Sequence, residues 1–317
     1  LRLYAIDHLH EVARVLIALQ SALIAKAEEY ADAPAPGFTH LQHAQPVLFG
    51  HELAKHAHAF ARDIDRIHDW LDRTSVSPLG SGALAGSSLP LAPEKTAHDL
   101  GFHASAANSI DGVSDRDFVA EAQKKKPDMA ELARGKAGRL VGNLTSVLTM
   151  LKGLPFAYNR DLQEDKEPLF DSIDTVLLVI PAVTGMVATT DFDREAMAAA
   201  APLGFSLATE IADYLVRAHV PFAEAHEAAG KCVALCESSD RQLHQLTDLE
   251  FTAIHPSLDG GVRDVLTVHG ALNSRTTFGG TSPVSLTQQL TDLKRHSGDA
   301  LNKFNDKAAA FAAMMGR

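Results

Sequence analysis

Two long stripes of apolar residues constrain the fold of this chain more than any other feature of its sequence. From Leu9 to Leu23, and again from Leu53 to Leu71, apolar side chains recur at alternating intervals of three and four residues. This spacing places them on one face of a helix and predicts long helices that pack through coiled-coil-like seams. Further apolar helices are predicted over residues 127–153 and 172–189, and no convincing strand alternation is present. The sequence therefore predicts an all-α fold built as a bundle of long helices.

Segments rich in proline and glycine divide the chain. Residues 32–37 end the first helix, and the next is expected to begin near Pro46, because proline suits the first turn of a helix. After about residue 190 the expected helices shorten and loops multiply. These features predict a central long-helix bundle domain over residues 1–190 and a small helical C-terminal domain over residues 191–317. Several helices are apolar on more than one face, so a homo-oligomer is expected.

Composition and charge narrow the classes of function. The formal charge of −11 disfavours binding through a general basic surface, so no nucleic-acid partner is expected, whereas a small anionic substrate could occupy a locally cationic pocket. The two cysteines, Cys232 and Cys236, are too few for a four-ligand zinc site and are expected to be reduced thiols. The longest apolar run, around Val176–Val187, is too short for a membrane span and is expected to be a buried bundle helix. No signal peptide is visible, and a cytoplasmic protein without a membrane partner is expected.

Three polar segments carry side chains that core packing does not require. Residues 39–46 present two His, two Gln and a Thr on a loop expected to precede a helix, where the helix dipole would favour proton transfer near neutral pH. Residues 108–117 place Arg116 between two Asp, an arrangement that can orient a guanidinium group toward a carboxylate. Residues 158–167 combine Tyr, Asn and Gln with charges, which favours a hydrogen-bonding site. Taken alone, each segment is also compatible with a structural role, as a capping loop, a solvated turn or a charged surface turn.

Other sequence motifs give no support to metal, nucleotide or serine-hydrolase chemistry. Four histidines on one expected helix lack the H-x-x-x-H spacing and have no carboxylates arranged around them, so no metal is expected. The glycine-rich segments 81–86 and 279–281 lack the lysine of a phosphate-binding P-loop. The chain also contains no G-x-S-x-G nucleophile elbow.

Together the polar segments resemble the argininosuccinate lyase and δ-crystallin family of the fumarase/aspartase superfamily. Residues 39–46 resemble the family's T-H-L-Q-x-A-Q-P, and residues 80–86 resemble its G-x-G-A-L-A-G loop. Residues 108–118 resemble N-S-x-D-x-V-S-D-R-D-F, and residues 158–167 match Y-N-[RK]-D-L-Q-E-D-K-E almost letter for letter. The last run is the one that points to argininosuccinate rather than to another substrate of the superfamily.

The resemblance implies a carbon–nitrogen lyase that reversibly splits argininosuccinate into arginine and fumarate in arginine biosynthesis. Such an elimination needs no redox step and no hydrolytic water, so no cofactor is expected. The resemblance implies an acid–base role for His40, an orienting role for Glu131 and stabilisation of transition-state charge by Lys124. It also implies a homotetramer whose active sites are shared between subunits. The positions that match substrate contacts or their near neighbours are Thr39, Gln42, Asn108, Arg116, Lys126, Tyr158, Arg160, Gln163 and Lys166.

The sequence departs from the family pattern in two places. The family has an N-terminal domain and a G-R-S-R-N-D-Q stretch before the segment that begins here, so a longer gene product is expected. The family also has a G-S-S-x-M-P-Q-K-K-N-P-D loop that carries the serine usually assigned as the base, and residues 123–128 match only its tail. Lys126 stands where the family has Asn. The alternatives are a non-catalytic structural protein of the δ-crystallin type, another fumarate-releasing lyase such as adenylosuccinate lyase, and a generic helical scaffold.

Overall fold

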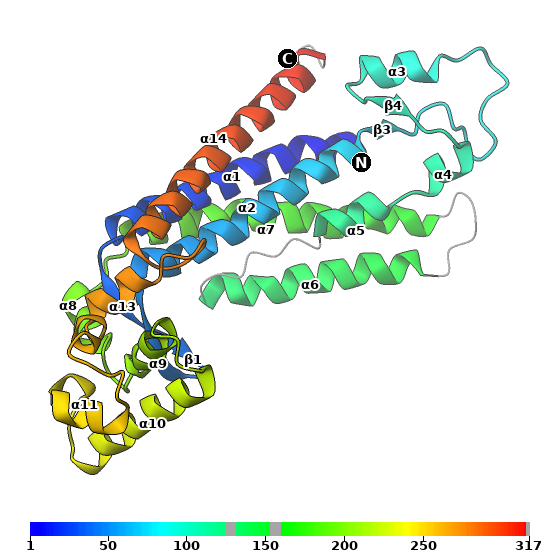
Figure 1. The fold of residues 1–317 in the computed structure, drawn as a ribbon. Helices are drawn as coiled ribbons and strands as arrows, with labels where there is room; N and C mark the ends of the chain where they lie inside the picture. The colour runs from blue at the N-terminus through cyan, green and yellow to red at the C-terminus, as the bar shows by residue number, and fades with distance from the viewer. Residues whose placement is uncertain (124–130, 153–159, 315–317) are drawn as a thin grey trace. The chain divides into compact units, whose positions relative to one another are not determined.

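The computed structural model describes residues 1–123, 131–152 and 160–314 (Figure 1). Helices dominate this part of the chain, and its strands form two short pairs. The prediction of an all-α fold is therefore confirmed. The chain forms two compact units, each assembled from segments that are distant in the sequence: unit 1 comprises residues 1–22, 57–189 and 294–317, and unit 2 comprises residues 23–56 and 190–293. The predicted domains, 1–190 and 191–317, have different bounds and stay a prediction.

Unit 1 is built mainly from long helices. The elements that lie wholly or partly in it are α1 (Arg2–Glu29), α2 (Phe49–Thr74), β3 (Val76–Ser77), α3 (Pro93–Asp99), β4 (Ala104–Ser105), α4 (Ser109–Ser114), α5 (Asp117–Gln123), α6 (Glu131–Leu151), the 3₁₀ helix η1 (Arg160–Asp165), α7 (Lys166–Thr189) and α14 (Pro283–Met314). The expectation that the helices shorten after residue 190 is wrong for α14, which has 32 residues.

The predicted stripes of α1 and α2 supply much of the core of unit 1. Leu16, Leu19 and Ile64 are each at most 5% exposed, and burying an aliphatic side chain of this size contributes about 1.5–3 kcal/mol. Trp70 is fully buried, and its indole Nε1 donates a hydrogen bond of 2.8 Å to the backbone oxygen of Phe118. That bond satisfies the polar edge of the ring and fixes α5 against α2.

Helix α7 exposes much of its apolar surface in the single chain. The helical segment Leu162–Thr189 is long and apolar enough to cross a membrane by length and composition, and only 28% of its apolar window is buried. Leu178 and Met186 are 70% and 47% exposed. The expectation that this run is too short for a span and lies buried in the bundle is therefore wrong. A helix that another chain covers can have the same length and apolar composition as a membrane span.

Unit 2 combines one hairpin with shorter helices. Its remaining elements are β1 (Pro34–Thr39), β2 (Gln42–Leu48), α8 (Arg194–Ala200), α9 (Ala208–Arg217), α10 (Phe222–Ser238), the 3₁₀ helix η2 (Leu243–Gln245), α11 (Asp248–Ile254), α12 (Val262–Val265) and α13 (Val268–Ser274).

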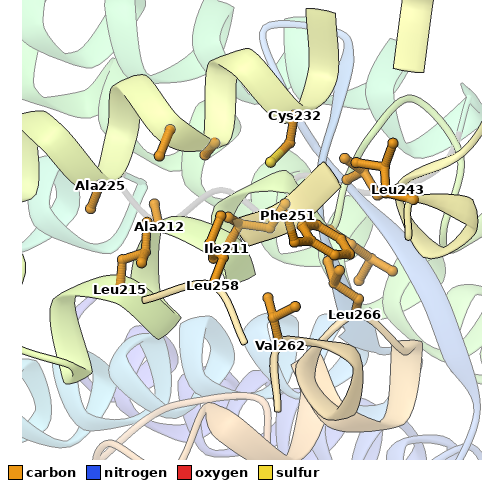
Figure 2. Packing of buried hydrophobic residues seen from close by; sticks show 14 of the residues in the cluster. Ile211, Ala212, Leu215, Ala225, Cys232, Leu243, Phe251, Leu258, Val262 and Leu266 are labelled. Carbon is orange, nitrogen blue, oxygen red and sulfur yellow. The ribbon is translucent and has the colours of Figure 1, made fainter. Parts of the chain in front are cut away.

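The core of unit 2 lies between α9, α10, α11 and α12, where Ile211, Cys232, Phe251 and Val262 are fully buried (Figure 2). Both cysteines are free and buried. Burial raises the pKa of the Cys232 thiol to about 12, so this group is a neutral, unreactive core side chain near neutral pH.

His10 is a titratable group inside unit 1. Its side chain is 4% exposed and lies edge-on to the ring of Phe304 on α14, with 5.9 Å between ring centroids. Its buried Nδ1 has no hydrogen-bond partner among the described residues. The pKa of His10 is lowered to about 4, mainly by burial; nearby Arg14 and Lys307 contribute to this shift, and Asp7 opposes it.

The depressed pKa of His10 predicts acid-sensitive stability. The unfolded chain takes up a proton near pH 6.5, whereas the folded chain resists protonation down to about 4. Stability is therefore fully present above pH 6.5 and falls as the pH drops toward 4, by up to about 3 kcal/mol. The melting temperature of His10→Gln should fall less steeply between pH 7 and pH 5 than that of the unmodified chain. His98→Gln, at an exposed histidine of the same unit, is the control, and parallel pH profiles for His10→Gln and the unmodified chain would contradict this account.

Candidate active site

Thr39, His40 and Gln42 lie at the tip of the β1–β2 hairpin. The two strands are antiparallel, Thr39 faces Gln42, and His40 with Leu41 forms a two-residue turn. Both turn residues are left-handed, with φ of 51° and 63°. Two-residue hairpins favour this conformation because it matches the strand twist, but a side chain in it costs about 1–2 kcal/mol. A strained backbone at this position indicates that the surrounding structure fixes it.

The hairpin corrects the predicted start of the second helix. Pro46 pairs with Pro36 inside the hairpin, and α2 begins only at Phe49. His40 therefore does not precede a helix, and the expected helix-dipole effect does not apply. Gly37 allows the strands to approach here, since a Cβ atom on it would lie 2.4 Å from the backbone oxygen of Gln45.

The hairpin tip is open to solvent. Thr39, His40 and Gln42 are exposed, and the side chain of Leu41 is 98% exposed. A tip with a hydroxyl, an imidazole and a carboxamide can donate protons and hydrogen bonds to a ligand.

Asp165 is the centre of a second group of polar residues, in unit 1. Its side chain is fully buried, and its two oxygens accept hydrogen bonds from Arg116 Nε at 2.7 Å and from Lys166 Nζ at 3.2 Å. Arg116 Nη1 also donates to the backbone oxygens of Val113 and Asp115. Two cations on one carboxylate leave a net positive charge, and both cations remain partly exposed. This arrangement suits an anionic ligand group.

A cavity of about 440 Å³ adjoins this cluster and includes Arg116 in its lining. Arg2, also in the lining, is 9% exposed, forms an ion pair with Asp115 and donates to the backbone oxygen of Thr74. The Arg2 guanidinium carbon lies 4.6 Å from the centroid of the Phe118 ring. The cavity therefore has charged walls of both signs, held in place by ion pairs.

The other predicted residues divide into three groups. Asn108 is the N-cap of α4, where its side-chain oxygen accepts hydrogen bonds from the backbone N–H groups of Ile110 and Asp111. Gln163 is exposed. Glu131 begins α6 and Arg160 begins η1, but their side chains lie outside the described part of the chain. The residues that lie wholly outside it are Lys124, Lys126 and Tyr158.

The structure brings Arg116 and Lys166 together, and it brings Thr39, His40 and Gln42 together. The two groups lie in different compact units. Sequence reasoning missed Asp165, although this carboxylate organises the first group. The available signal was an acidic residue directly before Lys166, in a run where only Leu162 is a plain aliphatic. Among the described residues, no three histidine, cysteine, aspartate or glutamate side chains are arranged to hold a metal ion.

Comparisons with known proteins place this fold among helical lyases. Residues 1–124 match a family described as Lyase. A solved structure of a variant EDDS lyase with bound fumarate superimposes with a TM-score of 0.87 at 22% identity, over 99% of this chain and 73% of that one. The class II fumarase of Schistosoma mansoni superimposes with a TM-score of 0.66 at 14% identity, over 81% of this chain and 65% of that one. The fold is therefore that of the helical fumarase-type lyases.

Closer relatives define the family. Residues 205–273 match a family described as Argininosuccinate lyase C-terminal. The chain is 50% identical to an argininosuccinate lyase of Acidothermus cellulolyticus, over 95% of this chain and 71% of that protein. It is also 50% identical to one of Frankia casuarinae, over 93% of this chain and 73% of that protein. The chain belongs to the argininosuccinate lyase family.

The alignment with these relatives also bears on the family loop of which residues 123–128 match only the tail. The match to the Acidothermus cellulolyticus relative spans 347 positions, whereas this whole chain has 317 residues. That relative therefore has residues within the matched region that this chain lacks.

The Asp165 cluster predicts a measurable loss of stability when its central charge is removed. Asp165→Asn keeps the shape of the side chain but leaves Arg116 and Lys166 without their anion, which should lower the free energy of unfolding by about 2 kcal/mol. Denaturant titration monitored by circular dichroism measures this change. Asp99→Asn, which breaks the exposed Lys95–Asp99 pair, should have little effect. Equal losses in the two variants would mean that Asp165 contributes no more than a surface ion pair.

Proposed function

We propose that this chain is an argininosuccinate lyase that catalyses the reversible elimination of argininosuccinate to arginine and fumarate. The observation that carries the proposal is the pair of cations, Arg116 and Lys166, held on the buried Asp165. The substrate has several carboxylates, and a chain with a formal charge of −11 needs a local cationic site to bind them. The family assignment supplies the reaction.

The proposed chemistry follows from the substrate. A base takes a proton from the carbon beside a carboxylate and leaves an anionic intermediate. The C–N bond then breaks as the C=C bond of fumarate forms, and an acid protonates the departing guanidino nitrogen. His40 transfers a proton in this scheme. Lys124 stabilises the carboxylate charge of the intermediate, and Glu131 orients His40. The serine that usually acts as the base in this family has no counterpart in the chain's match to the family loop, residues 123–128.

The remaining predicted contacts complete the proposed site. Thr39 and Gln42 flank His40 on the hairpin, so they can bind the same part of the substrate. The amide nitrogen of Asn108 can donate to the substrate while its oxygen caps α4. Residues 158–166 form the proposed substrate-recognition run, in which Gln163 and Lys166 have exposed side chains.

A homotetramer with active sites shared between subunits is the assembly that we propose. Its support is the exposed apolar surface of α6 and α7, where Val141, Leu148, Leu178 and Met186 are between 37% and 70% exposed. Among the described residues, no atom other than the backbone of α6 itself lies within 4 Å of a Cβ built on Gly138 or Gly142 of that helix. Open glycines beside exposed apolar side chains suit close packing of a second copy of the chain.

A cytoplasmic location is part of the same proposal, because arginine biosynthesis uses soluble metabolites. In this proposal the exposed face of α7 is covered by other subunits and not by lipid.

The activity is tested by fumarate release, followed by its ultraviolet absorbance. Wild-type protein should release fumarate from argininosuccinate, and His40→Asn should lower kcat by a factor on the order of 10²–10⁴, the usual contribution of a positioned acid–base group. His98→Gln is the control at an exposed histidine. Wild-type protein that releases no fumarate would favour the structural, δ-crystallin-type role. Release from adenylosuccinate but not from argininosuccinate would assign a different substrate.

The assembly is tested at Leu178, the most exposed of the four apolar residues on α6 and α7. Leu178→Lys places a charge in the proposed interface and should convert the tetramer into smaller species in analytical ultracentrifugation. Leu249→Lys, on α11, changes a leucine that is 84% exposed and should leave the tetramer intact. A Leu178→Lys variant that stays tetrameric would exclude this face as an interface.

A further inference from the structure

Glu210 is a fully buried carboxylate that the proposed chemistry does not use. It lies on α9, where it forms an ion pair with Arg275 and accepts a hydrogen bond of 3.2 Å from Ser274 Oγ. Arg275 also donates to Asp213 at 2.7 Å. Burial raises the pKa of Glu210, and Arg275 opposes that shift. Buried ion pairs are often no more stabilising than apolar residues of the same size, so a geometric role is a better explanation for this one.

Arg275 connects this ion pair to the end of strand β2. Its backbone oxygen accepts a hydrogen bond of 3.2 Å from the N–H of Ser282, which closes a turn. Gly280 fits inside that turn because it has no side chain: a Cβ atom would lie 2.3 Å from the same oxygen. The next residue, Thr281, is buried and accepts a hydrogen bond of 2.8 Å from the backbone N–H of Leu48. The turn is thereby fixed to the last residue of the hairpin.

Glu210 connects the same ion pair to residues further back along strand β2. Its neighbour Thr209 accepts a hydrogen bond of 3.2 Å from the side-chain amide of Gln45. Just before α9, Gly204 has a φ of 66°, and a Cβ on it would lie 2.8 Å from the Cβ of His43. The α8–α9 loop therefore lies in close contact with strand β2.

The two segments that hold strand β2 are thus joined to each other by one ion cluster. One is the turn that contains Thr281, and the other is the segment from Gly204 to Thr209. The hairpin tip is exposed and strained, so its direction depends on how firmly the base is held. A displacement of about 1 Å in a catalytic group can lower a rate by about 10²-fold.

We propose that Glu210 and Arg275 are positioning residues that set the orientation of the β1–β2 hairpin and thereby of Thr39 and His40. This inference rests on the proposed function of His40 in proton transfer. Glu210 and Arg275 act through the hairpin and do not contact the substrate.

The first experiment compares two ion pairs of unit 2. Glu210→Gln keeps the size of the side chain and removes its charge. The matched control is Glu250→Gln, which breaks the ion pair between Glu250 on α11 and Arg241 in the segment that follows α10. The two hydrogen bonds of this pair are 2.7 and 3.2 Å long. Hydrogen exchange of the backbone amides of residues 34–48 and steady-state fumarate release are measured on the full chain in its native assembly.

In Glu210→Gln, hairpin amides should exchange faster by about tenfold, and kcat should fall by about tenfold or more while KM changes less. In Glu250→Gln, hairpin exchange and kcat should match those of the wild type. Unchanged hairpin exchange in a folded Glu210→Gln variant would overturn the positioning role. Hydrogen exchange is measured without substrate, so it tests the positioning role even if wild-type protein releases no fumarate. The absence of fumarate release would refute the proposed function and not the positioning role.

A second pair of variants keeps the test decisive if Glu210→Gln does not fold. Thr281→Val is nearly isosteric and removes the oxygen that accepts from Leu48, whereas Thr281→Ser keeps it. Thr281→Val should reproduce the faster hairpin exchange and the lower kcat, and Thr281→Ser should restore both toward wild-type values. Wild-type exchange in Thr281→Val would show that the turn does not hold the hairpin.

Discussion

Asp165 and Glu210 are fully buried carboxylates, and each lies against an arginine that is 24% exposed. Removing a carboxylate from water is unfavourable unless a cation and further donors compensate for the lost hydration. Lys166 supplies the additional donor for Asp165, and Ser274 supplies it for Glu210. The planar guanidinium of an arginine that faces such an acid is held in one orientation, because its rigid arrangement of donors matches the carboxylate geometry. Each of the two ion pairs therefore fixes the position of the chain segments that carry its residues, in addition to neutralising the buried carboxylate.

The long helices were predictable because the spacing of apolar residues within a segment is enough to identify the buried face of a helix. Leu16 and Ile64 recur in a spacing that only a helix places on one face, and both are buried in the structure. The same spacing does not specify what covers a helix. Leu148 belongs to the expected apolar face of α6 but is 46% exposed in the single chain. The periodicity correctly predicts that this face of α6 is apolar. The periodicity of one sequence does not specify which other segment or chain covers that face.

The hairpin was not predictable by the same reasoning. Its strands contain Pro34, Pro36 and Pro46, which weaken a strand pattern, and its turn has no Asn-Gly or Gly-Gly signal. Pro46 favoured a helix start by local preference, yet pairing with Pro36 prevailed because the surrounding segments of unit 2 hold the strand. The role of Asp165 was hidden for a related reason. Its partner Arg116 is 49 positions away, and no local rule connects the two.

The two groups of proposed site residues obtain their geometry in different ways. Arg116 is fixed by a direct ionic partner and by two backbone oxygens, so its own contacts define where its remaining donors point. The side chain of His40 forms no ion pair or hydrogen bond with the described residues, and its backbone is in the left-handed region. Its placement must come from the backbone of the hairpin and from whatever holds the base of that hairpin. A flexible support would let the turn relax its strain and move the imidazole away from a substrate, so a rigid base is a physical requirement for proton transfer at this tip.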